Sequence, residues 1–297
     1  MPHIYAILMQ TMELRCSTPI SLGGSDQMMK KLFALALSVM MLLSFAACAA
    51  KDTTEAPAAS EGAGIKLLQE GVLSIGVEIG YPPFEDFAED GTTPIGYDID
   101  FANALGEKLG LTVNFVNTAW DGIFQGIGVN YDCVISAVTI TEERKASMLF
   151  SDPYINNFQA VVVRADYAGE ITSFLDLDGL AIAVQKETTS DILMSDYVST
   201  GSISATISAN EKITTCFTQL ANGEVDVVVV DSTVADGHLS SNPGKFLKAF
   251  QDESEPEQFG VALALDNAAL QAAINEAIAQ LVAEGFFEAN VAYWFGN

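Results

Sequence analysis

The residues best suited to chemistry follow a short apolar run at positions 133–138, a pattern that predicts a buried strand. Hydroxyl side chains stand within and just after this run, at Ser136, Thr139 and Thr141. Arg144 comes next, and a guanidinium beside hydroxyls at a strand end suits a carboxylate, because its planar fork can donate to both oxygens. A surface ion pair of Arg144 with Glu143 or Asp152 is the alternative, and spacing alone leaves both interpretations open.

Two further apolar runs also end in polar residues. The run at 180–185 is followed by Thr188 and Thr189, whose backbone amides would open a helix and attract an anion. The run at 225–230 ends in Asp231, and a carboxylate at the end of a buried strand needs a partner or a cleft. Ligands of open α/β sheets sit at the carboxyl ends of strands. An arginine, a helix N-terminus and an aspartate together predict a zwitterion site. Plain helix capping is the alternative for the two threonines and the aspartate.

Length and charge exclude several classes of function. The 297 residues suffice for one large or two smaller domains, and 49% of them are hydrophobic. A formal charge of -26 argues against nucleic acid and against electrostatic docking on an anionic membrane. His3 and His238 are far apart and the four cysteines form no CxxC, so we expect neither a metal nor a redox cofactor.

The first 64 residues have the composition of export and linker segments. We interpret residues 1–27 as a mis-assigned upstream start and residues 28–48 as a lipoprotein signal peptide, with basic, apolar and small-residue regions in order. Its end, residues 44–48 (Ser-Phe-Ala-Ala-Cys), resembles a bacterial lipobox, although Phe45 departs from the usual aliphatic residue. Ordinary cleavage near Ala50, or an uncleaved anchor, is the alternative to a lipid on Cys48. Residues 49–64 read as a disordered linker.

The remaining chain predicts two α/β units. Apolar runs indicate strands at 72–77, 111–116, 133–138, 159–164, 180–185, 225–230 and 259–265. Helical patterns begin near Asp98, Trp120, Ser190, Ile213 and Asn267. The order β-α-β-α-β at the start favours a parallel sheet. The chain is then expected to leave this first unit, form the second, and return for its last strand and helix.

The ordered set of motifs resembles the bacterial family 3 extracellular solute-binding proteins. The similarity rests on residues 80–85 (Gly-Tyr-Pro-Pro-Phe-Glu), 96–100, 136–144, 150–154, 184–189 and 230–232, and it spans about 71–295. It implies a two-lobed type II periplasmic binding protein fold, in which each lobe is a mostly parallel sheet with flanking helices and two hinge strands cross between them. By this resemblance residues 65–162 plus 258–297 form the first lobe and 163–257 the second.

The resemblance also implies roles for individual residues. Arg144 would hold a ligand carboxylate with the Thr139 hydroxyl and the Thr189 amide, and Asp231 would take the ammonium. The expected ligand-binding set is Glu78, Tyr81, Trp120, Ser136, Ala137, Thr139, Arg144, Gln185, Thr188, Thr189 and Asp231. In it Tyr81 and Trp120 would stack around the ligand, with packing in the core or on the lobe surface as the alternative. Glu78 would stand where relatives that bind cationic side chains can carry an acid, with plain solvent exposure as the alternative. Two positions depart from the family pattern: Glu187 replaces a common glycine, and Ala137 stands where some relatives have serine.

The implied function is capture of a polar L-amino acid by hinge closure, followed by delivery to the permease of an ABC importer. The sequence does not distinguish arginine or lysine from glutamine, cystine or another zwitterion as the ligand. An exported cyclohexadienyl (prephenate or arogenate) dehydratase on the same fold and a ligand-binding adaptor of a sensory receptor are the alternatives. We expect a monomer that is no enzyme, anchored by lipid outside the cytoplasmic membrane or periplasmic. Cys133 and Cys216 are expected to be free, buried thiols on different lobes.

Overall fold

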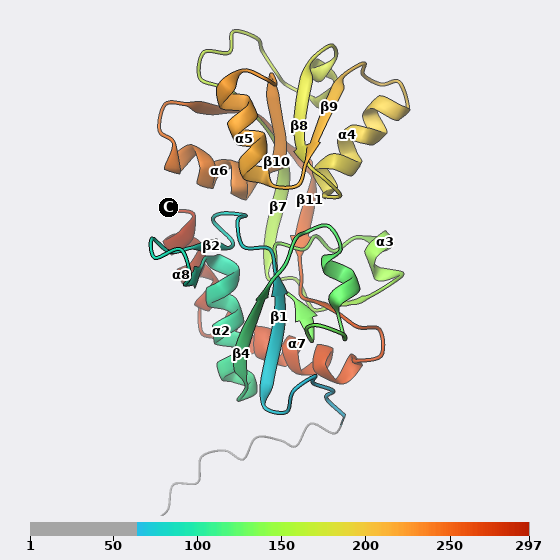
Figure 1. The fold of residues 1–297 in the computed structure, drawn as a ribbon, viewed down its shortest axis with the longest axis vertical. Helices are drawn as coiled ribbons and strands as arrows, with labels where there is room; N and C mark the ends of the chain where they lie inside the picture. The colour runs from blue at the N-terminus through green and yellow to red at the C-terminus, as the bar shows by residue number, and fades with distance from the viewer. Residues whose placement is uncertain (1–63, 297) are drawn as a thin grey trace, which may run out of the picture. The chain divides into compact units, whose positions relative to one another are not determined.

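A computed structural model describes residues 64–296, which fold around two five-stranded sheets (Figure 1). The upstream start, the signal peptide with Cys48, and the linker up to residue 63 lie outside the described residues. Among the described residues, no helix combines the length and the apolar character needed to cross a membrane. The two-lobed α/β fold expected from the sequence is confirmed.

The first sheet has the strand order β4-β1-β5-β12-β6. Its strands are β1 (Val72–Val77), β4 (Thr112–Asn117), β5 (Cys133–Val134), β6 (Leu149–Phe150) and β12 (Ala262–Leu263). β1 pairs in parallel with β4 and β5, while β12 pairs antiparallel with β5 and β6. A small hairpin, β2 (Asp86–Phe87) and β3 (Pro94–Ile95), and helix α2 (Tyr97–Leu109) lie between β1 and β4 in the chain.

The second sheet has the order β11-β7-β10-β8-β9. Its strands are β7 (Ile155–Arg164), β8 (Ala181–Gln185), β9 (Thr206–Asn210), β10 (Val227–Asp231) and β11 (Phe246–Phe259). β8 is parallel to β9 and β10, whereas β7 is antiparallel to β10 and β11. Both sheets are therefore more mixed than the mostly parallel arrangement expected from the sequence.

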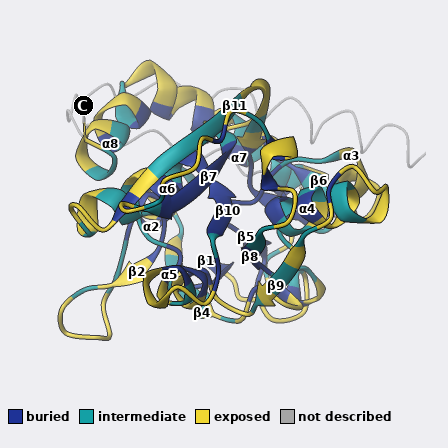
Figure 2. Ribbon diagram, turned by 90° about the horizontal axis from the view of Figure 1, so that it is seen from above, coloured by how far each residue is buried: buried dark blue, intermediate teal, exposed yellow. Residues whose placement is uncertain are grey.

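Helices pack against the sheets, and central strands such as β1, β7 and β10 are largely buried, whereas β2 and much of β11 are exposed (Figure 2). The remaining helical segments are η1 (Ile123–Gly126), α3 (Glu142–Lys145), η2 (Phe174–Leu177), α4 (Thr189–Ser199), α5 (Ile213–Asn222), α6 (Ser232–Ser241), α7 (Ala268–Ala283) and α8 (Phe286–Trp294). Cys133 and Cys216 are free and buried, in β5 and α5 respectively, as expected. The helix predicted near Trp120 is only the short 3-10 turn η1.

Strands β7 and β11 run side by side and carry the chain between the sheets (Figure 1). β7 follows β6 of the first sheet, and β11 precedes β12, which returns to that sheet. The register of the pair shifts between Asp252 and Glu257, so the bond ladder is interrupted there. The predicted lobe boundaries at 162/163 and 257/258 fall within these two strands and stay a prediction.

Two strand predictions were wrong in extent. The strand expected at 133–138 ends at Val134, because the chain turns at Ala137, whose φ of 48° is incompatible with an extended ladder. The returning strand expected at 259–265 is instead the long β11, followed after two residues by the two-residue β12. β11 is polar along much of its length, so its pairing with β7, and not an apolar pattern, makes it a strand.

The turn before α2 is closely packed. Gly96, the residue that precedes the helix, has a φ of 140°, and a Cβ added there would lie 2.0 Å from the carbonyl oxygen of Phe84. The Phe84 ring is fully buried and meets Tyr97 and Phe259 edge-on, with centroids 5.7 and 5.4 Å apart. Only glycine permits this approach, which sets the path of the 80–85 loop toward the site.

Candidate functional site

A small pocket lies between the two lobes, where strands of both sheets end. It is lined by Glu78, Tyr81, Glu85, Trp120, Ser136, Ala137, Thr139, Arg144, Gln185, Thr188, Thr189 and Asp231. Every residue of the predicted ligand-binding set is among them, and Glu85 is added. β1 ends just before Glu78, β8 ends at Gln185 and β10 ends at Asp231. The carboxyl ends of strands from both sheets therefore meet at this pocket.

Arg144 presents a guanidinium to the pocket from the short helix α3. Thr141 caps this helix by accepting a hydrogen bond from the Arg144 amide at 3.1 Å. The guanidinium Nη1 donates to the Thr139 carbonyl at 2.9 Å, and its carbon lies 5.5 Å from the centroid of the Trp120 ring and 5.2 Å from that of Phe124. Among the described residues Arg144 has no carboxylate within ion-pair distance. The alternative of a surface ion pair is therefore not observed.

The electrostatic setting of Arg144 favours an anion. Burial lowers the pKa of the guanidinium, and the carboxylates of Glu257 and Asp231 act in the opposite direction. An arginine stays charged even so, because its unperturbed pKa is far above neutrality. Cation–π contact with two rings fixes the fork without occupying all its N–H donors. The free donors can bind a carboxylate that enters the pocket.

Asp231 stands on the other lobe with its carboxylate buried in the same pocket. Its Oδ1 accepts from Asn157 Nδ2 at 2.6 Å and from Gln159 Nε2 at 3.1 Å, and its Oδ2 accepts from the Tyr81 hydroxyl. The carboxylate makes no capping bond to α6, so capping does not explain it. Burial, and next the negative charge of Glu257, raise the pKa of Asp231 to about 7.

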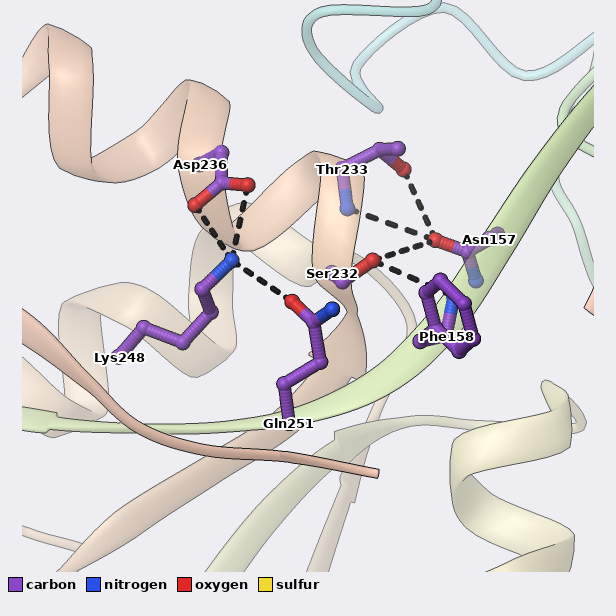
Figure 3. A network of polar contacts seen from close by, with 7 residues as sticks. All are labelled: Asn157, Phe158, Ser232, Thr233, Asp236, Lys248 and Gln251. Carbon is purple, nitrogen blue, oxygen red and sulfur yellow. Dashed lines mark hydrogen bonds and ion pairs between the residues drawn. The ribbon is translucent and has the colours of Figure 1, made fainter. Parts of the chain in front are cut away.

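A network of polar contacts links helix α6, which begins just after Asp231, to β7 and β11 (Figure 3). Asn157 on β7 accepts hydrogen bonds at its Oδ1 from the hydroxyls of Ser232 and Thr233 at the start of α6, at 3.2 and 3.1 Å. Farther along the same helix, an ion pair of 2.8 Å joins Lys248 on β11 to Asp236. The network ties α6 to both hinge strands, and Asn157 of β7 also bonds the Asp231 carboxylate itself.

The two threonines at the start of α4 have different roles. Thr188 caps the helix by accepting from the Asp191 amide at 3.3 Å, so the capping interpretation holds for its side chain. The Thr189 hydroxyl instead donates to Glu257 Oε2 at 3.2 Å. Glu187, just before them, has a φ of 60°, the left-handed region that the glycine of the family pattern adopts without strain. Its amide donates to Asp191 at 2.8 Å.

Glu78 is a further acidic group that lines the pocket. Glu78 Oε2 accepts from Gln185 Nε2 at 2.7 Å, and burial raises the pKa of Glu78 to about 7 although Lys212 acts against it. The Gln185 Oε1 atom is buried and has no hydrogen-bond donor among the described residues. These groups can accept hydrogen bonds from a ligand side chain that carries N–H donors.

The turn at Ser136 and Ala137 is held by two buried carboxyls from the first lobe. Ser136 Oγ donates to Glu85 Oε1 at 2.6 Å, and the Ala137 amide donates to Asp98 Oδ2 at 2.7 Å. Burial raises the pKa of Asp98 to about 7, and burial, and next the negative charge of Asp98, raise the pKa of Glu85 well above its usual range. Sequence reasoning placed neither in the predicted set, although both belong to motifs that it used.

Direct bonds join the two lobes across the pocket. Besides the Tyr81–Asp231 and Glu78–Gln185 bonds, Trp120 Nε1 donates to the Glu187 carbonyl at 3.2 Å, and Lys186 pairs with Asp121 at 2.9 Å. The lobes are therefore closed on each other. Tyr81 and Trp120 line the pocket, but Tyr81 bonds Asp231 and Trp120 lies against Arg144, so their stacking on a ligand stays a prediction.

Sequence reasoning missed the polar residues that the hinge strands bring to the site. These are Asn157 and Gln159 on β7 and Glu257 on β11. Asn157 and Gln159 are two residues apart, so a strand places both side chains on one face of the sheet. Two polar residues at this spacing beside the apolar part of β7 could have indicated that this face lines a polar site. Among the described residues no cluster of histidine, cysteine, aspartate and glutamate could hold a metal ion.

Comparison with known proteins gives the class of protein that this fold and pocket define. Residues 73–297 match the bacterial extracellular solute-binding proteins, family 3, and the chain belongs to this family. The family is extracellular, so the protein is exported.

Several individual relatives are named for the amino acids that they bind. The chain is 30% identical over 228 residues to the ABC transporter arginine-binding protein 1 of Escherichia coli K12, which covers 75% of this chain and 90% of the relative. It is 31% identical over 240 residues to the L-cystine-binding protein TcyJ of the same strain, covering 80% and 88%. Among solved structures, an ancestral arginine-binding protein bound to arginine shares 33% identity and a TM-score of 0.71, covering 76% of this chain and 99% of that one. A solved structure of an ancestral arginine-binding protein bound to glutamine also shares 33% identity and a TM-score of 0.71.

Proposed function

We propose that this protein binds a polar L-amino acid between its lobes and delivers it to an ABC importer. The observation that carries the proposal is the pairing of two opposite charges in one pocket. Arg144 of the first lobe has no carboxylate partner among the described residues, and Asp231 of the second lobe lies buried across from it. A zwitterion satisfies both groups at once, because its carboxylate and ammonium lie on one carbon.

The proposed roles follow from the chemistry of each group. Arg144 binds the α-carboxylate through its free N–H donors, and the backbone amide of Thr189 at the start of α4 adds a further donor. Asp231 accepts the α-ammonium and gives up its bond from Tyr81. Ser136 offers its backbone carbonyl to the same ammonium. Binding would replace direct contacts between the lobes with contacts through the ligand, and hinge closure would then depend on it.

Two acceptor groups in the pocket lining support a ligand side chain that donates hydrogen bonds. Glu78, whose carboxylate is buried, and the unpartnered Oε1 of Gln185 both accept. We therefore propose a basic or amide-bearing amino acid, with arginine as the first candidate. The names of relatives that bind arginine, and the solved complex of one with glutamine, support this class.

Export and anchoring complete the proposal. We propose that Cys48 carries a lipid and tethers the exported domain to the outer face of the cytoplasmic membrane. The supporting signal is the small-residue sequence before Cys48 after an apolar run. The relatives that are named for ABC transport support a permease as the membrane partner.

Thermal unfolding of the exported domain against the twenty amino acids tests the proposal. A ligand present at about 1,000 times its Kd stabilises the folded state by about 4 kcal/mol. We expect arginine to give the largest shift, and an absence of response to any α-amino acid would contradict the proposal. A turnover assay with prephenate addresses the dehydratase alternative, and product formation would favour the enzyme. No second function is favoured by the site.

A further inference from the structure

Glu257 brings a carboxylate to the anion-binding side of the site, and none of the roles above accounts for it. It lies on β11 opposite Asn157 of β7, at the point where pairing resumes after the register shift. Its side chain is half-buried and lines a second, larger cavity that shares Arg144 and Thr189 with the ligand pocket. The hinge strand thus carries an acid to the boundary of the ligand pocket.

Three hydrogen bonds fix the Glu257 carboxylate. Its Oε2 accepts from Thr139 Oγ1 at 3.0 Å and from Thr189 Oγ1 at 3.2 Å, and its Oε1 accepts from Gln159 Nε2 at 3.0 Å. Thr139 belongs to the first lobe and Thr189 to the second, so one carboxylate bridges the two lobes. The family resemblance assigns the Thr139 hydroxyl to the α-carboxylate of the ligand, and the proposed function assigns the Thr189 backbone amide to it, so Glu257 contacts both residues expected to bind that group.

The charges around Glu257 agree with this position. After burial, Glu257 is the largest influence on the pKa of Arg144, which it raises. It is also the largest charge acting on the pKa of Asp231. Glu257 therefore lies within electrostatic reach of the Arg144 guanidinium and of the carboxylate proposed to take the ammonium.

We infer that Glu257 occupies the subsite of the α-carboxylate in the ligand-free closed form and must be displaced when an amino acid binds, an inference that rests on the proposed function. A hydroxyl has one hydrogen to donate. While the hydroxyls of Thr139 and Thr189 donate to Glu257, neither can donate to a ligand. Glu257 is then an internal competitor that weakens binding of amino acids with a free carboxylate.

A different role for Glu257 gives the opposite result. If its carboxylate accepted the ligand ammonium beside Asp231, its removal would weaken binding. If it only braced the two threonines, its removal would leave affinity unchanged or lower it. The sign of the change in affinity therefore separates competition from both of these roles.

The Glu257→Gln variant tests the inference, with Glu255→Gln as its control. Glu255 is exposed on the same strand. Its substitution removes one negative charge and leaves the hydrogen bonds of Thr139 and Thr189 to Glu257 in place. By calorimetry we expect L-arginine to bind Glu257→Gln about tenfold more tightly than wild type, equivalent to about 1.4 kcal/mol. L-Arginine methyl ester, which lacks the carboxylate, should gain nothing. Equal or weaker binding of L-arginine by Glu257→Gln, or an equal gain in Glu255→Gln, would overturn the inference.

A second measurement needs no amino acid. In Glu257→Ala the hydroxyls of Thr139 and Thr189 and the Arg144 fork face a space of carboxylate size. We expect sodium acetate to raise the Tm of this variant more than sodium chloride of equal ionic strength does, and to have no such effect on wild type or Glu255→Ala. An equal acetate effect in all three proteins would overturn the inference. If wild type binds no amino acid, the proposed function fails, and this measurement alone decides whether Glu257 occupies an anion subsite.

Discussion

Binding of an amino acid should release a proton from Asp231. In the ligand-free protein, burial first and Glu257 second raise the pKa of this carboxyl to about 7. An ammonium group placed against it favours the ionised form and lowers that pKa again. Between the two pKa values the free protein holds a proton that the complex does not, so binding and proton release are linked.

The size of the pH effect on ligand affinity follows from the pKa of Asp231 in the ligand-free protein. With a value near 7, roughly 3% of the carboxyls are ionised at pH 5.5 and roughly 76% at pH 7.5. If the complex is fully ionised, the affinity should fall roughly 25-fold between pH 7.5 and pH 5.5. At pH 6, about 0.9 proton should leave Asp231 for each ligand that binds.

Calorimetric titrations in two buffers with different ionisation enthalpies measure the number of protons released for each ligand that binds. L-Arginine is a suitable ligand because its guanidinium stays charged throughout. Glu78, whose pKa is also about 7, can add a second proton. Asp231→Asn is the control, and its proton count at pH 6 should be lower than that of wild type by about one. Tight binding with no proton release and a flat affinity between pH 5.5 and 7.5 would refute the reasoning.

The same raised pKa acts on the stability of the free protein with a definite sign. The folded state binds more protons than the unfolded state between the unperturbed value of 3.8 and about 7. The free energy of unfolding should therefore rise as pH falls from 8 toward 4. Asp231→Asn should be more stable than wild type at pH 8, and the gap should close at low pH. Urea titrations of the two proteins, without ligand, check this difference.

Two further substitutions test the geometry. Arg144→Lys keeps the charge but loses the planar fork, so affinity for L-arginine should fall roughly 10- to 100-fold by calorimetry. Lys145→Met, in the exposed neighbour on α3, should bind as wild type does, and an equal loss in both would contradict the role of the fork. Gly96→Ala places a Cβ 2.0 Å from the Phe84 carbonyl oxygen and should cost at least ~3 kcal/mol in urea unfolding. Gly91→Ala, at a φ of 69° with open space around it, should cost much less, and comparable losses would contradict the steric argument.

The pocket residues could be found from the sequence because they follow apolar runs. β8 and β10 read as buried strands, so Gln185, Thr188 and Asp231 could be assigned to strand ends. Ends of neighbouring parallel strands meet at one edge of a sheet, and this rule brought the residues together without any knowledge of distances. That Arg144 has no ion pair within residues 64–296 could not be predicted, because it depends on how the side chain packs against Trp120 and Phe124.

The polar hinge strand β11 and its contribution to the site could not be predicted from apolar runs. β11 contains the sequence Gln-Asp-Glu-Ser-Glu-Pro-Glu-Gln at positions 251–258, which has neither an apolar run nor alternation. It is a strand because β7 supplies a ready edge for pairing. The register shift between Asp252 and Glu257 decides which acid of this segment turns toward the pocket, and no pattern in the sequence encodes that shift. Glu257 was therefore missed.

The buried cysteines Cys133 and Cys216 provide a separate chemical probe of local unfolding in each lobe. Burial raises the pKa of Cys216 to about 12 and that of Cys133 still further. Alkylating reagents attack the thiolate, so neither sulfur reacts while its surroundings are folded. Cys133 lies in the first sheet and Cys216 on a helix of the second lobe, so mapping of the alkylated peptides reports separately how often each half of the domain opens.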